Sequence, residues 1–190
     1  MIAFCLASTD HGPMLVNRMD YQHSFDGGFF GVGAQLLENR CYDAREVDVL
    51  KDLLKVRRKY YGDGVVAIDC GANIGVHSVE WAALMRRWGF VIAIEAQERI
   101  FYALAGNLTL NNCLNARAVW AAVGASCGEL SFPEPNYTEI SSFGSFELKQ
   151  RLGTEFIGQE LDYSKPTITV RQISLDSLQL ERVDLIKMDV

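Results

Sequence analysis

The residues best suited to chemistry lie in a glycine-containing turn that follows an apolar run. Residues 65–68 are all apolar, as in a parallel strand buried on both faces of a sheet. The run leads into Asp69-Cys70-Gly71-Ala72-Asn73-Ile74-Gly75, where glycines let the backbone approach a ligand. Ligands of open α/β sheets bind beyond the carboxyl ends of the strands. We therefore expect a binding site here, in which Asp69 accepts a hydrogen bond from a cationic amino group or orients the turn.

The spacing of this turn favours a cofactor with an amino-acid end over a dinucleotide. Its pattern is Gly-x-Asn-x-Gly, so Asn73 stands where a pyrophosphate-binding turn usually has its second glycine. Asp69, directly at the strand end, would also repel a pyrophosphate. A nicotinamide-dependent oxidoreductase is therefore a less favoured alternative. A non-catalytic cofactor-binding module is another.

Glu95 is a second acid at the end of an apolar run. It follows residues 90–94 and stands 20 residues after Gly75. An acid in this position accepts hydrogen bonds from both ribose hydroxyls of an adenosine cofactor. Taken alone, Glu95 would be an ordinary surface acid at a strand end. Together with the glycine turn, it predicts the ribose site.

From residue 61 onward, apolar runs alternate with helical patterns, which is typical of the α/β class with a mostly parallel, doubly wound sheet. Residues 1–42 instead mix apolar residues with the turn-formers Asp26-Gly27-Gly28 and Gly31-Val32-Gly33, and predict strands and a hairpin or flap rather than a helix. We expect a single structural unit, with an N-terminal extension at 1–60 and the cofactor-binding domain at 61–190. The predicted helices are 43–60, capped by Asp43, then 75–88 and 98–111; the predicted strands are 65–69, 90–94, 116–123 and 184–188, with 65–69 between 91–95 and 184–188.

Residues 128–173 interrupt this alternation with prolines and glycines. The strands at 129–132 and 167–173 are expected to pair, with a long loop at 133–166 between them. Long loops in compact domains are often functional. We expect this loop to cover the acceptor side of the cofactor and to be mobile without acceptor.

Composition excludes several classes of partner. The net charge of −6 disfavours a nucleic acid, and no apolar run is long enough to span a bilayer. The five cysteines include no Cys-x-x-Cys pair, so we expect neither a metal site nor disulfides, but free, mostly buried thiols in the cytoplasm. His11 and His23 have no acid or cysteine partner at a telling spacing and are expected at the surface. Trp120 is expected in the core.

The segment Val66 to Ser78 resembles the first motif of FkbM-family methyltransferases. Residues 91–96, with Asn107, Leu108 and Asn111, resemble that family's second motif and helix, and residues 121–124 and 183–190 resemble its later strands. The resemblance implies a Rossmann-like methyltransferase fold. It also implies methyl transfer from S-adenosylmethionine, usually to an oxygen of a sugar, natural product or other small molecule.

By this resemblance, a set of residues around the turn binds the cofactor. Glu95 would hold the ribose and Ala96 would pack beside the adenine. His77 and Ser78 begin a helix, whose N-terminus favours anions, and would contact the cofactor carboxylate. A solvated or capping histidine is the alternative for His77. The full set is Asp69, Gly71, Ala72, Asn73, Ile74, Gly75, His77, Ser78, Glu95 and Ala96.

Asp189 ends the last predicted strand. It is either a general base for an acceptor hydroxyl or a strand-end acid that orients a loop. Family members continue beyond this strand with Glu-Gly, whereas this sequence stops at Val190. We therefore expect the domain to be incomplete at its C-terminus and the chain to be a piece of a longer protein. The alternative is that residues 1–42 or a second subunit, as in a homodimer, cover the strand at 184–188.

Overall fold

The central sheet has the predicted order. A computed structural model describes residues 2–23 and 29–190 of the chain. Within these residues the parallel strands follow one another as β11, β5, β6 and β7. β5, the strand that leads into the glycine turn, therefore lies between its two predicted neighbours. The fold is Rossmann-like α/β. The bounds are β5 (Val65–Cys70), β6 (Gly89–Glu95), β7 (Ala116–Trp120) and β11 (Leu185–Met188).

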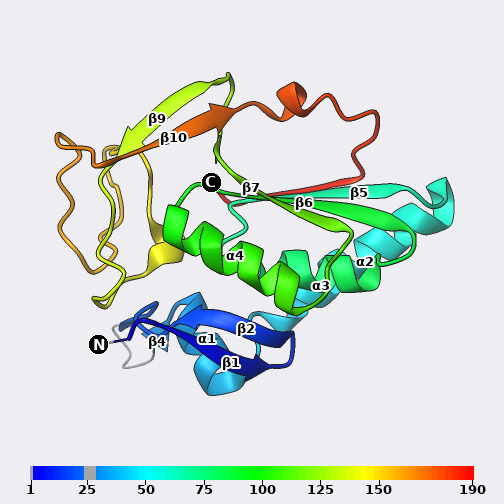
Figure 1. Cartoon of the computed structure of the whole chain (residues 1–190), viewed down its shortest axis with the longest axis horizontal. Coiled ribbons are helices and arrows are strands. Elements are labelled where there is room, and N and C mark those ends of the chain that lie inside the picture. The colour runs from blue at the N-terminus through cyan, green and yellow to red at the C-terminus, as the bar shows by residue number, and fades with distance from the viewer. Residues whose placement is uncertain (1, 24–28) are drawn as a thin grey trace.

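Both faces of this sheet are covered, which explains the continuous apolar runs in its strands. On one face Ala67 and Val91 belong to a core shared with the helices. On the other face Ile68 and Ile92 pack with Ile173. Figure 1 shows the helices below the sheet and the β9–β10 ribbon above it. The covering helices are α2 (Ala44–Tyr61), α3 (Val76–Leu84) and α4 (Glu98–Leu110).

The N-terminal extension packs on the helices, not on the sheet. Its hairpin of β1 (Phe4–Thr9) and β2 (Gly12–Asn17) lies against α4 (Figure 1). The alternative that residues 1–42 cover β11 is therefore wrong for the described residues. Short strands β3 (Gln22–His23) and β4 (Phe29–Phe30) follow, while the turn predicted at 26–28 lies outside the described residues.

The prediction of no helix before residue 42 is also wrong, because α1 spans Val32–Asn39. Gly31 at its N-cap supplies no side-chain acceptor. The carboxylate of Asp20 accepts the Gly33 N–H at 3.2 Å instead, and the Asp20 carbonyl accepts the Ala34 N–H. The capping group is thus distant in sequence, so no local pattern marks the start of this helix.

The later elements follow the predictions with two changes. Asp43 caps α2 as expected, since its carboxylate accepts the Glu46 N–H at 3.1 Å. α3 ends at Leu84 rather than residue 88, because the N–H groups of Trp88 and Gly89 both bond to the Met85 carbonyl and turn the chain. The predicted strand 116–123 is divided, since β8 (Ala122–Val123) leaves β7 and pairs with β10.

A second sheet carries the long loop. β9 (Gly128–Phe132) and β10 (Ile168–Ile173) pair antiparallel, as predicted. The loop between them contains the short helix η1 (Phe143–Ser145), and η2 (Leu175–Leu178) follows β10. The loop descends from this ribbon, past the carboxyl ends of the central strands, towards the N-terminal extension (Figure 1). The loop therefore connects the β9–β10 ribbon with the N-terminal extension at the carboxyl ends of the central strands, where ligands of such sheets bind.

Several side chains lie elsewhere than expected. His11 is buried rather than at the surface, because its Nδ1 lies 2.9 Å from the Glu80 carboxylate and its Nε2 accepts the Tyr42 N–H. Trp120 is 37% exposed rather than in the core. The thiols are free in the described residues, but they are not mostly buried: only Cys70 and Cys113 are, and Cys127 is exposed. In the part of the chain described, no helix combines the length and apolarity that crossing a bilayer requires.

Candidate cofactor site

A cavity of about 970 Å³ lies at the carboxyl ends of the central strands. The glycine turn and the end of β6 form its floor. The N-terminal extension, the long loop and the end of β11 form its walls. It is lined by residues 71–77, 94–97, 121–126 and 144–149, together with Phe30, Val32, Gln35, Tyr42, Lys187 and Asp189, among others. Eight of the ten predicted cofactor residues therefore line one space with Asp189.

The glycine turn is fastened to the end of β6. The N–H groups of Gly71 and Ala72 both donate to the Ile94 carbonyl, at 3.0 and 2.9 Å. Gly71 has a φ of 72°, and a Cβ there would overlap the carbonyl oxygen of Asp189. Glycine is therefore required at this position by the passage of the chain after β11 as well as by the turn itself.

Glu95, the residue predicted to hold the ribose, lines the cavity at the end of β6. Its side chain is buried, and its oxygens accept the N–H groups of Asn73 at 2.9 Å and Gln97 at 2.8 Å. Burial raises the pKa of Glu95 to about 7, against the lowering effect of these backbone hydrogen bonds. Each carboxylate oxygen retains a lone pair for a further donor. The group can therefore accept two hydroxyls from the cavity.

Asp69 and Ser78 lie behind the turn and do not line the cavity. The Ser78 hydroxyl donates to Asp69 Oδ2 at 2.7 Å. The other oxygen, Oδ1, has no hydrogen-bond partner among the described residues, and the Lys187 ammonium lies 3.9 Å from it. Burial raises the pKa of Asp69, while Lys187 and Ser78 lower it. Asp69 therefore connects the end of β5 to the first turn of α3.

His77 does line the cavity, but it is neither solvated nor a helix cap. The residue is 5% exposed, with its ring against Tyr42 and Trp81. Burial lowers its pKa to about 4, so the imidazole is neutral at pH 7. Its Nε2 lies 3.4 Å from the Glu46 carboxylate and makes no hydrogen bond within the described part of the chain.

Sequence reasoning missed Gln97 and Lys187, which also line the cavity. The Gln97 amide donates to the Phe143 carbonyl and so joins the end of β6 to the long loop. Lys187 is a charged residue inside an otherwise apolar strand, with its side chain only 14% exposed. A lysine at a half-buried strand position was a usable signal, because burying a charge is costly unless it is paired. Gln97 offered no such signal.

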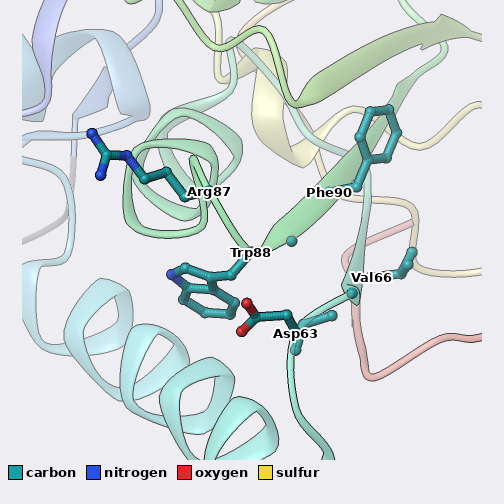
Figure 2. Close-up of a pocket in the computed structure, with 8 residues that line it drawn as sticks. Asp63, Val66, Arg87, Trp88 and Phe90 are labelled. Carbon is teal, nitrogen blue, oxygen red and sulfur yellow. The ribbon is translucent and has the colours of Figure 1, made fainter.

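A second hollow, of about 420 Å³, lies at the opposite, amino ends of β5 and β6. Figure 2 shows that the rings of Trp88 and Phe90 are directed away from each other there. Asp63 is already paired, since its carboxylate accepts a 2.7 Å hydrogen bond from Arg58. The side chains of this hollow converge on no common point, so the chemistry belongs to the larger cavity.

Comparison with known families agrees with this assignment. A family model described as the methyltransferase FkbM domain matches residues 69–190, which include the glycine turn, Glu95 and Asp189. The chain belongs to the FkbM methyltransferase family. S-adenosylmethionine is therefore the cofactor of this FkbM domain. No curated protein matches the chain.

Several solved structures are similar to part of the chain. One is the precorrin-6y C5,15-methyltransferase of Geobacter metallireducens GS-15, with 23% identity over 43% of this chain and 40% of that one, at a TM-score of 0.36. Another is a SAM-dependent methyltransferase of Agrobacterium tumefaciens, with 13% identity over 64% and 33% and a TM-score of 0.41. A third is a SAM-dependent O-methyltransferase of Thermotoga maritima, with 15% identity over 60% and 54% and a TM-score of 0.35. The match thus spans about half or less of each structure's length.

The residues of the cavity fit an adenosine cofactor with an amino-acid end. Glu95 has acceptor capacity for two hydroxyls, and a ribose presents two. Asn73 and Gly75 both have positive φ, and the turn that contains them lines the cavity. The cavity volume lies at the upper end of the range for small-molecule pockets, so a second molecule can enter beside the cofactor.

Proposed function

We propose that this FkbM domain transfers a methyl group from S-adenosylmethionine to a hydroxyl oxygen of a sugar or another small molecule. The observation that carries the proposal is that Glu95, the glycine turn and Asp189 line one cavity. The cofactor supplies a sulfonium methyl group. In the transfer, the acceptor oxygen forms a bond to that methyl carbon as the sulfur–carbon bond breaks, and the hydroxyl proton is lost.

The chain's main contribution is alignment, because the positive sulfur already activates the leaving group. In this proposal Glu95 holds the ribose, Ala96 packs beside the adenine, and residues 71–75 surround the methionine part. Asp69 and Ser78 set the shape of the turn from behind it.

Asp189 is the proposed acceptor of the hydroxyl proton. Its side chain is 71% exposed and lines the cavity, so an acceptor can reach it. The Lys187 ammonium lies 3.3 Å from its Oδ2 and holds the carboxylate at the edge of the cavity. A carboxylate can take up the hydroxyl proton as general base, while alignment of acceptor and methyl group supplies most of the rate.

The acceptor wall is proposed to come from both the extension and the loop. Phe30, Val32 and Tyr42 present apolar and aromatic surface to the cavity, and Gln35 adds an amide. Across the cavity, the loop contributes Phe146. Because residues before 60 line the same space as the domain at 61–190, we treat the two parts as one functional unit.

A methyl-transfer assay tests this proposal. The chain is incubated with S-adenosylmethionine carrying an isotopic methyl label and a panel of sugars, phenols and amines, each followed by mass spectrometry. We expect label on oxygen, and a loss of about 10²-fold or more in rate with Asp189→Asn at saturating S-adenosylmethionine. Label on nitrogen or carbon alone would contradict the oxygen specificity. An unchanged rate in Asp189→Asn would remove the base role.

A further inference from the structure

Lys187 presents a fixed positive charge to the cofactor cavity. It is the β11 residue paired in register with Asp69 of β5. Its ammonium lies 3.9 Å from the buried Asp69 carboxylate and 3.3 Å from Asp189. A lysine has three N–H donors, and these two carboxylates account for at most two of them. The ammonium is thus held in place while it keeps capacity for a further anionic partner.

Two neighbouring features favour the same kind of ligand. His77 Nε2 is buried, lines the cavity and has no hydrogen-bond partner among the described residues. His77 also lies in the first turn of the nine-residue α3, where backbone N–H groups lack helical partners and favour anions. An opposing charge is close by, since the carboxylate of Glu46, whose side chain is 44% exposed, lies 3.4 Å from His77 Nε2. Groups that can donate to an anion therefore line the same cavity from two elements, β11 and α3.

We infer that Lys187, with His77 and the first turn of α3, binds the α-carboxylate of the cofactor's amino-acid end. This inference rests on the proposed function, because it needs an adenosylmethionine in the cavity. The carboxylate is the one anionic group of that cofactor, and an ammonium held between Asp69 and Asp189 is its natural partner. Lys187 is thereby a specificity-determining residue, which distinguishes the amino-acid form of the cofactor from a bare nucleoside thioether.

Calorimetry with two ligands isolates this contact. S-adenosylhomocysteine carries the amino-acid end, whereas methylthioadenosine has the same nucleoside and thioether without it. We expect the wild-type chain to bind S-adenosylhomocysteine more tightly than methylthioadenosine. In Lys187→Met the affinity for S-adenosylhomocysteine should fall at least about tenfold, while that for methylthioadenosine stays within about twofold. Lys187→Arg, which keeps the cation, should restore most of the difference.

Lys149 provides the matched control, because it also lines the cavity but comes from the long loop. Lys149→Met should leave the ratio of the two affinities unchanged. If this ratio fell as much in Lys149→Met as in Lys187→Met, the effect would come from the overall positive charge of the cavity, and the inference would be overturned. Equal loss of both ligands in Lys187→Met, or no loss of either, would also overturn it. A wild-type chain that binds neither ligand would contradict the proposed function itself, whereas one that binds both equally would overturn only the role of Lys187.

Discussion

The side-chain amide of Gln97 donates a 2.9 Å hydrogen bond to the carbonyl oxygen of Phe143. The N–H of the same phenylalanine donates to the Asp20 carboxylate at 3.1 Å. The backbone N–H of Gln97 in turn donates to Glu95. Both backbone groups of one buried loop residue are therefore held by side chains from other elements. Through Gln97, residue Phe143 of the long loop is connected to the carboxylate of Glu95, which is proposed to hold the ribose.

Replacing Gln97 by leucine tests this coupling. The substitution removes the 2.9 Å side-chain bond to the buried Phe143 carbonyl and leaves it with the longer bond from the Phe146 N–H at 3.4 Å, so we expect the free energy of unfolding to fall by about 1–3 kcal/mol. Cofactor affinity should fall as well, because the loop around Phe143 loses a bond that holds it beside the cavity. Gln159→Leu is the control, since Gln159 bonds Asn136 on the exposed part of the same loop. Equal cofactor affinities in the two variants, measured by calorimetry, would argue against the coupling.

Cofactor affinity should depend on pH through Glu95. Its pKa, raised by burial to about 7, leaves the carboxyl largely neutral at pH 5.5 and ionised at pH 8. Two hydroxyl donors favour the ionised form, so we expect affinity to rise with pH across this window. In the free protein the sign is opposite: folding favours the protonated form, and this contribution to stability is lost as pH rises through 7.

Glu95→Gln separates this effect from other titrating groups, such as Asp20, whose pKa is raised by burial to about 6. The variant should bind more weakly than wild type at pH 8 and should lose most of the rise between pH 5.5 and 8. Calorimetry at several pH values measures both quantities. A rise of the same size in the variant would assign the pH dependence to another group.

Gly71→Ala should destabilise the fold through the end of β11. The added Cβ would meet the Asp189 carbonyl, and the φ of 72° is unfavourable for alanine. Gly62→Ala is a matched control, because Gly62 has a similar φ of 75° with nothing within 4 Å of its Cβ. We expect Gly71→Ala to cost about 1–3 kcal/mol more than the control in thermal or urea unfolding. Equal costs would mean that only backbone strain matters there.

Asp184 should be a main determinant of acid stability. Its buried carboxylate accepts hydrogen bonds from Arg57, Arg182 and the Val66 N–H. Burial alone would raise its pKa, but these bonds outweigh burial and lower it. Its contribution is therefore present at neutral pH and is lost as pH falls below the ordinary range of an aspartate.

Asp184→Asn should lower the free energy of unfolding by about 1–3 kcal/mol at pH 7, because the hydrogen bonds from the two half-buried arginines lose their ionised acceptor. The difference from wild type should shrink as the solution is acidified. Asp52→Asn is the comparison, since Asp52 is exposed and paired with Lys55 on the surface of α2, and it should cost less than about 1 kcal/mol. Urea unfolding of the three proteins at pH 7 and at about pH 2.5 checks this, and a constant difference in the free energy of unfolding would refute the linkage.

The parts of the fold that were predictable from sequence depend on local or periodic signals. The apolar runs around Ile68 and Ile92 are buried on both faces and predicted the sheet order, and Asp43 marked the start of α2. α1 could not be predicted, because its capping group is Asp20, which lies 13 residues before Gly33 in the sequence. The burial of His11 depends on Glu80, which the chain brings to it only after folding.

The site was predictable to the same extent. Glu95 and the glycine turn were identified because their spacing reflects a strand, a turn and a helix in series. The placement of Asp69 behind the turn required knowledge of Lys187 on a neighbouring strand. Gln97 was missed because its partner, Phe143, comes from a loop whose path no local pattern specifies.

Calorimetric titration of S-adenosylmethionine into the wild-type chain and into Glu95→Ala tests the central claim most directly. We predict one binding site per wild-type chain. In Glu95→Ala, binding should be weaker by about 1–3 kcal/mol, a loss of roughly 5- to 150-fold in affinity, because the ribose hydroxyls lose a buried acceptor. Equal affinity in the two proteins, or tight binding of NADH by a wild-type chain that does not bind S-adenosylmethionine, would contradict the assignment of this cavity.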